Sequence, residues 1–300
     1  MSEASRALFR SFTLSLFMKR LVPYTLIAPY VLHLAVFVLF PVVFSVVLTF
    51  HSWNIISPMQ YVGFDNYAHL LKDRLFWQAL WNTIRFLLLH IPLQIVVALA
   101  LAEMLNGPIR GRAFFRGAFF LPVIVSGVVV TILWQQLLGF NAGMINRLLT
   151  GIGIPKVPWL ESPDVAMYSI ALMATWKNVG LYVILFLVGL QTVPTQYYEA
   201  ADLEGATPWQ KFRYITLPMI NPTLFMVVVL STIGGFSLFI EPYIMTEGGP
   251  LNSTLSAVMY IYRQAFQYYH MGYSATLGFC FALLILAVVA IQKRYVETTD

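Results

Sequence analysis

Six long apolar stretches constrain this chain more than any other feature. A helix needs about 20 mostly apolar residues to cross a hydrocarbon layer of about 30 Å. The segments that meet this length lie near residues 24–49, 84–104, 115–138, 166–189, 219–240 and 272–291, and the first, third and sixth are the most apolar. With 59% hydrophobic residues, 10% charged residues and a mean hydropathy of +0.75, the composition excludes an ordinary water-soluble domain. The sequence predicts an all-α polytopic membrane protein with six transmembrane helices, forming a single transmembrane domain over residues 1–300.

The N-terminus, residues 1–22, is basic and precedes the first of these stretches. A secretory signal also begins in this way, but its apolar core is only roughly 7–15 residues long, whereas the run here covers residues 21–50. We therefore expect the run to remain as a membrane span. Residues 11–18 are weakly amphipathic, which fits either a helix on the membrane surface or an unstructured basic tail.

The Lys and Arg residues predict the orientation of the chain. With six spans both termini share a side, and that side, with the loops near 110–116 and 191–218, carries 11 of the 18 basic residues. The opposite side carries five, and Arg85 and Lys177 lie within spans. Because cytoplasmic loops carry an excess of Lys and Arg, we expect both termini and the 191–218 loop to be cytoplasmic. The net charge of +5 therefore reflects orientation rather than nucleic-acid binding.

The loops on the other side have recognisable local patterns. Residues 61–81 mix aromatic and charged residues, which favours an interfacial helix but also fits the aromatic belt at a membrane edge. Residues 141–163 are rich in Gly and Pro and predict turns. Residues 247–250 form a strong turn signal, and residues 255–266 predict a helix before the last span.

Motifs for catalysis and cofactor binding are missing from the sequence. No Gly-Lys dipeptide occurs, which excludes a phosphate-binding P-loop, and no G-x-S-x-G nucleophile motif is present. The five histidines are dispersed, and Cys280, the one cysteine, lies in an apolar run. We expect no enzyme activity, metal or cofactor in this chain, although a membrane enzyme built from residues that folding brings together stays an alternative.

Lys177 is the outlier among the spans because it lies near the middle of the fourth. A charged side chain at that depth costs about 2.5–3.5 kcal/mol on insertion scales, so it should face the protein interior or a water-filled path. Its neighbours Trp176, Asn178 and Tyr182 supply aromatic surface and hydrogen-bonding groups that suit a polar solute. An equal alternative is that Lys177 pairs with a carboxylate or backbone carbonyls and only holds helices together.

The fifth span contains a run of small and polar residues. Ser231 and Thr232, followed by Gly234, Gly235 and Ser237, allow either close helix packing or a helix break beside a pathway. We favour packing, and include Ser231 and Thr232 with the fourth-span residues as candidates for a substrate path.

Residues 191–222 form a polar interruption built from helix signals. Thr195 is expected to cap a short helix, and Gly205 stands where a left-handed helix end favours glycine. Thr207, Pro208 and Gln210 then give an N-cap, a proline at the first helical position and a capping box. The stretch predicts two short helices joined by a tight glycine turn, a shape suited to docking.

The same stretch resembles the signature loop of permease subunits in binding-protein-dependent ABC importers. Glu199, Ala200, Ala201 and Gly205 form an E-A-A-x-x-x-G pattern, and I-x-L-P follows the glycine after nine intervening residues. The residues that carry the resemblance, or lie within the motif, are Glu199, Ala200, Ala201, Asp202, Gly205, Ile215, Leu217 and Pro218. Glu204 departs from the family pattern, which usually has aspartate there, but it keeps the charge.

Further motifs are similar to the sugar and glycerol-3-phosphate branch of these permeases. They lie at residues 63–67, 76–77, 82–83, 121–122, 143–146, 159–160, 246–250 and 260–262. The resemblance implies a multi-pass subunit of the cytoplasmic membrane that moves a sugar, oligosaccharide or sugar-like solute by alternating access. It also implies a coupling helix at Glu199–Ala201, a second permease, two ATPase subunits that bind ATP and Mg²⁺, and an external solute-binding protein. An ion-gradient-driven transporter and a membrane scaffold are the alternatives, and the sequence has almost no intramembrane carboxylate to support the former.

Overall fold

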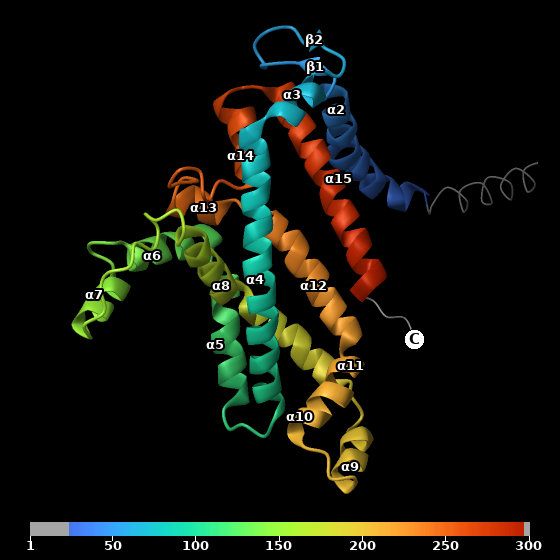
Figure 1. Cartoon of the computed structure of the whole chain (residues 1–300). Helices are drawn as coiled ribbons and strands as arrows, with labels where there is room; N and C mark the ends of the chain where they lie inside the picture. Colours follow the sequence, from blue (N-terminus) through green and yellow to red (C-terminus); the bar gives the residue numbers. More distant parts are fainter. Residues whose placement is uncertain (1–23, 297–300) are drawn as a thin grey trace, which may run out of the picture.

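The computed structural model describes residues 24–296, and these are mostly helical (Figure 1). Five helical segments are long and apolar enough to cross a membrane, which confirms five of the six predicted spans. They are Tyr24–Leu48, α4 (Arg74–Asn106), α8 (Ala166–Gln191), Asn221–Met245 and Met271–Arg294. Tyr24–Leu48 contains η1 (Ala35–Leu39) and α2 (Phe40–Leu48). Asn221–Met245, the predicted fifth span, contains α12 (Asn221–Phe236) and α13 (Ile240–Met245), and Met271–Arg294 belongs to α15 (Met271–Val296). The basic N-terminus and its expected surface helix lie outside the described residues.

The predicted third span, residues 115–138, is not one continuous helix. It divides into α5 (Arg112–Ile124) and α6 (Gly127–Leu138), which meet at an angle of 96°. The prediction of an unbroken helix was wrong because apolarity says nothing about direction. Pro122 cannot donate a backbone hydrogen bond within α5, and Val125 is extended with φ −74° and ψ 141°. A sixth span exists only if this bent pair is counted as one.

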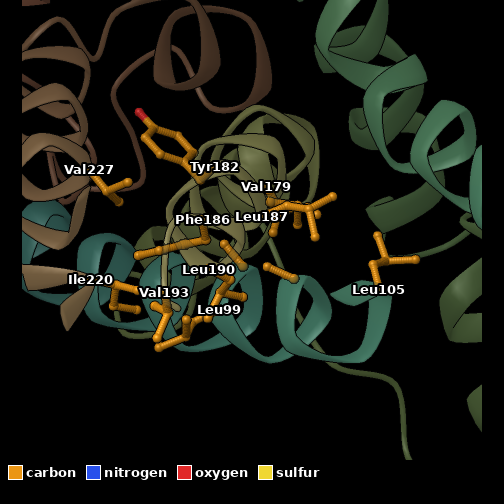
Figure 2. Close-up of a cluster of buried hydrophobic side chains, with 13 residues drawn as sticks. Leu99, Leu105, Val179, Tyr182, Phe186, Leu187, Leu190, Val193, Ile220 and Val227 are labelled. Carbon is orange, nitrogen blue, oxygen red and sulfur yellow. The ribbon is translucent and has the colours of Figure 1, made fainter. Parts of the chain in front are cut away.

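The core forms where α8 packs against α4, α5 and α12. Figure 2 shows one buried cluster in which Leu99 of α4, Phe186 and Leu190 of α8, and Val227 of α12 lie together. Gly180 lets α8 approach α5 closely, because a Cβ at this position would overlap the backbone carbonyl of Phe119. α8 therefore packs against α4, α5 and α12, whereas α15 packs against α2 and α12.

The end of the molecule farthest from α9 carries five of the short elements (Figure 1). They are the antiparallel strands β1 (His51–Ser52) and β2 (Gln60–Tyr61), α3 (Asp65–Lys72), α14 (Ala257–Tyr262) and η3 (Arg263–Gln267). The predicted helix at 255–266 is confirmed. The expected helix within 61–81 divides, since α3 ends at Lys72 and Arg74 already begins α4. Another helix, α7 (Met144–Gly151), occupies part of the stretch 141–163 that the sequence assigned to turns.

Asp73 causes the restart between α3 and α4 and joins distant segments. One carboxylate oxygen accepts hydrogen bonds from the backbone N–H groups of Leu75 and Phe76, at 3.0 and 3.2 Å. The other accepts from the hydroxyls of Tyr260 and Tyr273, both at 2.6 Å. Burial alone would raise the pKa of Asp73, but these hydrogen bonds together hold the pKa below its ordinary value. An ionised Asp73 therefore ties α4 to α14 and α15.

Candidate functional site

The polar stretch after α8 folds into two helices joined by a tight turn. Its elements are α9 (Thr195–Leu203), α10 (Pro208–Lys211), η2 (Phe212–Thr216) and the short α11 (Leu217–Met219). We call residues 195–219 the finger; in Figure 1 its α9 and α10 lie at the lower end of the molecule. The predicted capping box is confirmed, since the Thr207 backbone N–H donates to Gln210 Oε1 at 2.7 Å and Gln210 N–H donates to Thr207 Oγ1 at 3.3 Å.

The start of the finger differs from the prediction in one residue. Pro194, with φ −63° and ψ 133°, occupies the N-cap position, and Thr195 is the first helical residue with no capping hydrogen bond. A threonine caps a helix only when its own backbone is extended, and here the proline takes that conformation.

The turn between the two helices depends on Gly205. Its φ of +75° is in the left-handed region, and no neighbouring atom lies within 4 Å of where a Cβ would stand. The N–H of Ala206 donates to the carbonyl of Ala201 at 2.9 Å, and that of Gly205 donates to Asp202 at 3.1 Å. Glycine is therefore required by the backbone conformation and not by lack of space.

The finger presents an acidic residue and uncovered apolar side chains. Glu199, Ala200, Asp202 and Gly205 are exposed, and Ala201 is half-buried. Leu203 is 92% exposed and Trp209 is 69% exposed, although both are large and apolar. Apolar groups left open on a projecting element indicate a surface that a partner covers.

The base of the finger is fixed to the helical core. Lys211 donates to Asp202 at 2.5 Å, which ties α10 to α9, and the hydroxyls of Tyr198 and Thr216 are 2.8 Å apart. Ile215 and Leu217 pack against the buried cluster of Figure 2, whereas Pro218 is exposed. A displacement of the finger would therefore act directly on α8 and α12.

A second candidate site is a cavity of about 230 Å³ among α4, α8, α12 and α13. Its polar and charged lining residues are His90, Lys177, Asn178, Tyr182, Ser231, Ser237 and Glu241. Four of the six predicted substrate-path residues thus line one cavity, namely Lys177, Asn178, Tyr182 and Ser231.

The other two predicted path residues point elsewhere. Trp176 packs on Trp134 with ring centroids 5.6 Å apart, and it lines a separate, mainly apolar cavity beside α5. The hydroxyl of Thr232 donates to the carbonyl of Val228 and accepts from Gln292 Nε2, both at 2.8 Å. Consecutive residues on a helix differ in direction by about a quarter turn, so neighbours in sequence do not share a face.

His90 is the polar cavity residue that the sequence did not single out. Its Nδ1 lies 2.8 Å from Thr175 Oγ1, and that hydroxyl is 2.8 Å from the carbonyl of Ala171. Because the threonine hydrogen goes to this carbonyl, Thr175 accepts from a protonated Nδ1, which leaves Nε2 of His90 as the ring's acceptor. The spacing of His90 in an apolar span resembles that of any core histidine, so only the fold identifies it.

The small residues of the fifth span both pack and interrupt the helix. A Cβ on Gly235 would overlap the side chain of Leu87, so this glycine permits a close approach of α12 to α4. At Ser237 the helix stops, and α13 begins at Ile240. The close packing and the helix break drawn from the sequence are thus both present, and the break forms part of the cavity wall. A pathway beside it stays a prediction.

Lys177 has no protein partner in the part of the chain that the structure describes. Its Nζ lies 3.4 Å from the place that a Cβ of Gly127 would take, at the start of α6. No carboxylate oxygen of residues 24–296 lies within 4.0 Å of this ammonium. The one ion pair found among those residues joins Lys211 to Asp202. Pairing of Lys177 with a carboxylate of residues 24–296 therefore finds no support. Among the same residues, no cluster of His, Cys, Asp and Glu is suited to hold a metal ion.

Comparisons with known proteins agree with this geometry. The family model for the "binding-protein-dependent transport system inner membrane component" matches residues 94–298. The chain is 36% identical to the lactose transport system permease protein LacF of Rhizobium radiobacter, over 89% of this chain and 91% of that protein. It is 34% identical to the arabinooligosaccharides transport system permease protein AraP of Bacillus subtilis, over 92% and 88% of the two chains.

A solved structure shows the same fold. It is that of a bacterial ABC transporter involved in the import of the acidic polysaccharide alginate, with a TM-score of 0.79 and 25% identity, over 96% of this chain and 100% of that one.

Proposed function

This chain belongs to the family of inner membrane components of binding-protein-dependent transport systems, and from that membership we propose its cargo and the residues that couple transport to ATP hydrolysis. The chain is the multi-pass permease subunit of an ABC importer; the ATPase activity of such a system resides in separate chains. Two parts of the chain support the proposal, the finger and the cavity beside the break in the fifth span.

The proposed cargo is a sugar, an oligosaccharide or a sugar-like solute. Two relatives that align over most of this chain are named for lactose and for arabinooligosaccharides. The cavity supports this choice because amide, hydroxyl and imidazole groups line it. Such groups bind the hydroxyls of a sugar in place of water. Lys177, Asn178, Tyr182 and Ser231 would then lie along the path, with Trp176 and Thr232 behind its walls.

The finger is the proposed contact with the ATPase subunit. The observation that carries this assignment is the combination of an exposed Glu199, uncovered Leu203 and Trp209, and a base packed into the helical core. ATP and Mg²⁺ would bind the two ATPase subunits. Their closure would push on the finger, and Ile215 and Leu217 would pass the motion to α8 and α12 as a rigid-body movement.

The remaining partners are a second permease and an external solute-binding protein. The cavity is not fully enclosed by the described residues, which suits a path completed by a second subunit. Under the proposed orientation the finger and both termini face the cytoplasm, and the hairpin end, which carries β1 and β2, faces the binding protein. An ion-gradient-driven transporter or a membrane scaffold would need none of these partners.

Substitutions in the finger test whether it couples transport to ATP hydrolysis. Gly205→Val should reduce uptake by the reconstituted importer at least about tenfold while membrane insertion stays normal, because a β-branched residue is strained at a φ of +75°. Reversing the charge with Glu199→Lys should act in the same direction. Gly205→Asn is the matched control, since asparagine tolerates this conformation and should retain most uptake.

The measurements are radiolabelled uptake and ATP hydrolysis stimulated by the loaded binding protein. Full stimulation and full uptake in both Gly205→Val and Glu199→Lys would refute the coupling role.

A further inference from the structure

The environment of the Lys177 ammonium indicates which charge the cargo carries. Leaving an ammonium near the middle of a span costs about 2.5–3.5 kcal/mol on insertion scales, and proteins usually offset this with a paired charge. No carboxylate or carbonyl hydrogen-bonds to Lys177 in residues 24–296. Within residues 24–296 the positive charge is therefore left without a partner, and a bound solute can supply one.

The surroundings hold the ammonium in the cavity. Its end lies beside Gly127 and near Ile240, so that any side chain at position 127 would crowd it. Glu241 lines the same cavity but does not approach within 4.0 Å of the ammonium. It stands in the first turn of α13 and is partly exposed, so water and the α13 backbone can satisfy its charge.

Arg85, a second cationic residue within the spans, differs from Lys177 because it has partners in the protein. The guanidinium of Arg85 in α4 lies 5.3 Å from the ring centroid of Tyr168, and one of its nitrogens is 3.4 Å from the carbonyl of Asp164. Arg85 does not line the cavity. Of these two intramembrane cations, Arg85 has partners among the described residues and Lys177 has none there.

The other cavity walls suit hydroxyl groups. Asn178 donates its Nδ2 to the carbonyl of Ala174 at 2.9 Å, which leaves its carbonyl oxygen as a free acceptor. Tyr182, Ser231 and the Nε2 of His90 add a further set of donors and acceptors. The cavity therefore combines partners for neutral hydroxyls with one unpaired cation, in a volume of about 230 Å³ that fits a single small unit of a cargo.

We propose that this importer carries an acidic carbohydrate, with Lys177 binding the carboxylate of one sugar unit as it passes through the membrane. The inference rests on the proposed function, because it assigns the chemical class of the cargo to the same path. Lys177 is then the residue that sets the charge preference of the permease.

The test compares a matched pair of probes in proteoliposomes that hold the complete importer and its binding protein. The probes are an oligogalacturonide and its fully methyl-esterified, uncharged form. Lys177→Met should lower the ratio of acidic to neutral uptake at least about tenfold, because removing one partner of a desolvated charge pair is costly. The binding protein is the same in every sample, so its own preference cancels when ratios are compared between variants.

Three further variants decide how the result is read. Lys177→Arg should restore most of the ratio. Glu241→Gln should raise it, since the carboxylate that repels an acidic cargo is gone. Arg85→Met, which removes a cation outside the cavity, should leave the ratio unchanged.

An equal fall in uptake of both probes with Lys177→Met would overturn the proposal, and would point instead to a carboxylate of the second permease as the partner of Lys177. A wild-type complex that takes up only the neutral probe, or neither, would also overturn it. Failure of the proposed function would give a different result. This chain would then not copurify with an ATPase, and no loaded binding protein would stimulate ATP hydrolysis.

Discussion

At the scale of single residues, Asp73 controls how the hairpin end is assembled. Its hydrogen bonds come from two backbone N–H groups and from Tyr260 and Tyr273, which stand 187 and 200 positions later in the chain. Burial and the adjacent carboxylate raise the pKa of Tyr260, so its hydroxyl stays protonated and keeps donating. A carboxylate held in this way favours the folded state only while it is ionised.

We expect the stability of the hairpin end to fall in acid. The pKa of Asp73 is lower in the folded than in the unfolded chain, so its contribution is full above about pH 4 and is lost as the pH falls through the folded value. Asp73→Asn should destabilise the protein at pH 7 by about 1–3 kcal/mol, which lowers the melting temperature. It should also flatten the loss of stability below about pH 4. Thermal unfolding in detergent as a function of pH measures both effects.

Glu161→Gln is the control. Because Glu161 is exposed, this substitution should change neither the melting temperature at pH 7 nor its dependence on pH. A pH profile of Asp73→Asn identical to that of the parent protein would contradict this role for Asp73.

At the scale of elements, the approach of α5 to α8 depends on a single glycine. A methyl group at position 180 would meet the carbonyl oxygen and carbon of Phe119 and the Cα of Phe120, which are backbone atoms and cannot rotate away. Side chains could yield to such a change, but a packed helix backbone must move as a whole.

We expect Gly180→Ala to separate α5 from α8 and to destabilise the permease by about 1–3 kcal/mol, the usual range for overpacking. Gly278→Ala in α15 is the matched control, since no atom lies within 4 Å of its Cβ position and alanine favours the helix. The melting temperatures of the two purified variants give the comparison. Equal stability of both would show that α5 and α8 are not fixed against each other.

At the scale of the whole molecule, the finger matters because it joins the helical core to another protein. Leu203 is 92% exposed at its tip. Leu203→Asp should abolish copurification of the ATPase subunits, because it places a charge at the centre of an apolar contact. Leu251→Asp is the control, since Leu251 is 83% exposed on the loop after α13 and should leave copurification intact.

The measurement is the ratio of ATPase subunits to permease in the affinity-purified complex, determined by quantitative mass spectrometry. Retention of both ATPase subunits by the Leu203→Asp complex would place the docking contact elsewhere.

Local sequence patterns were enough to predict the long helices and the finger. Runs of about 20 apolar residues must be helices across a membrane, because no other local structure satisfies backbone hydrogen bonds there. The two helices and the left-handed Gly205 of the finger followed from capping residues and a glycine, whose effects reach only a few positions along the chain. The helix-boundary error at Thr195 has the same local origin, since Pro194 and Thr195 are adjacent candidates for one cap.

Which side chains meet could be learned only from the folded chain. Apolarity could not reveal the 96° bend between α5 and α6, because both halves are equally hydrophobic. Nor could it separate Lys177 and Ser231, which line one cavity, from Trp176 and Thr232, which point away from it. Helix rotation sets that division, and it is fixed by close contacts such as Gly180 on Phe119 and Gly235 on Leu87, between residues far apart in the chain. His90 became a site residue for the same reason: packing, and not its place in the sequence, turns its ring toward the cavity.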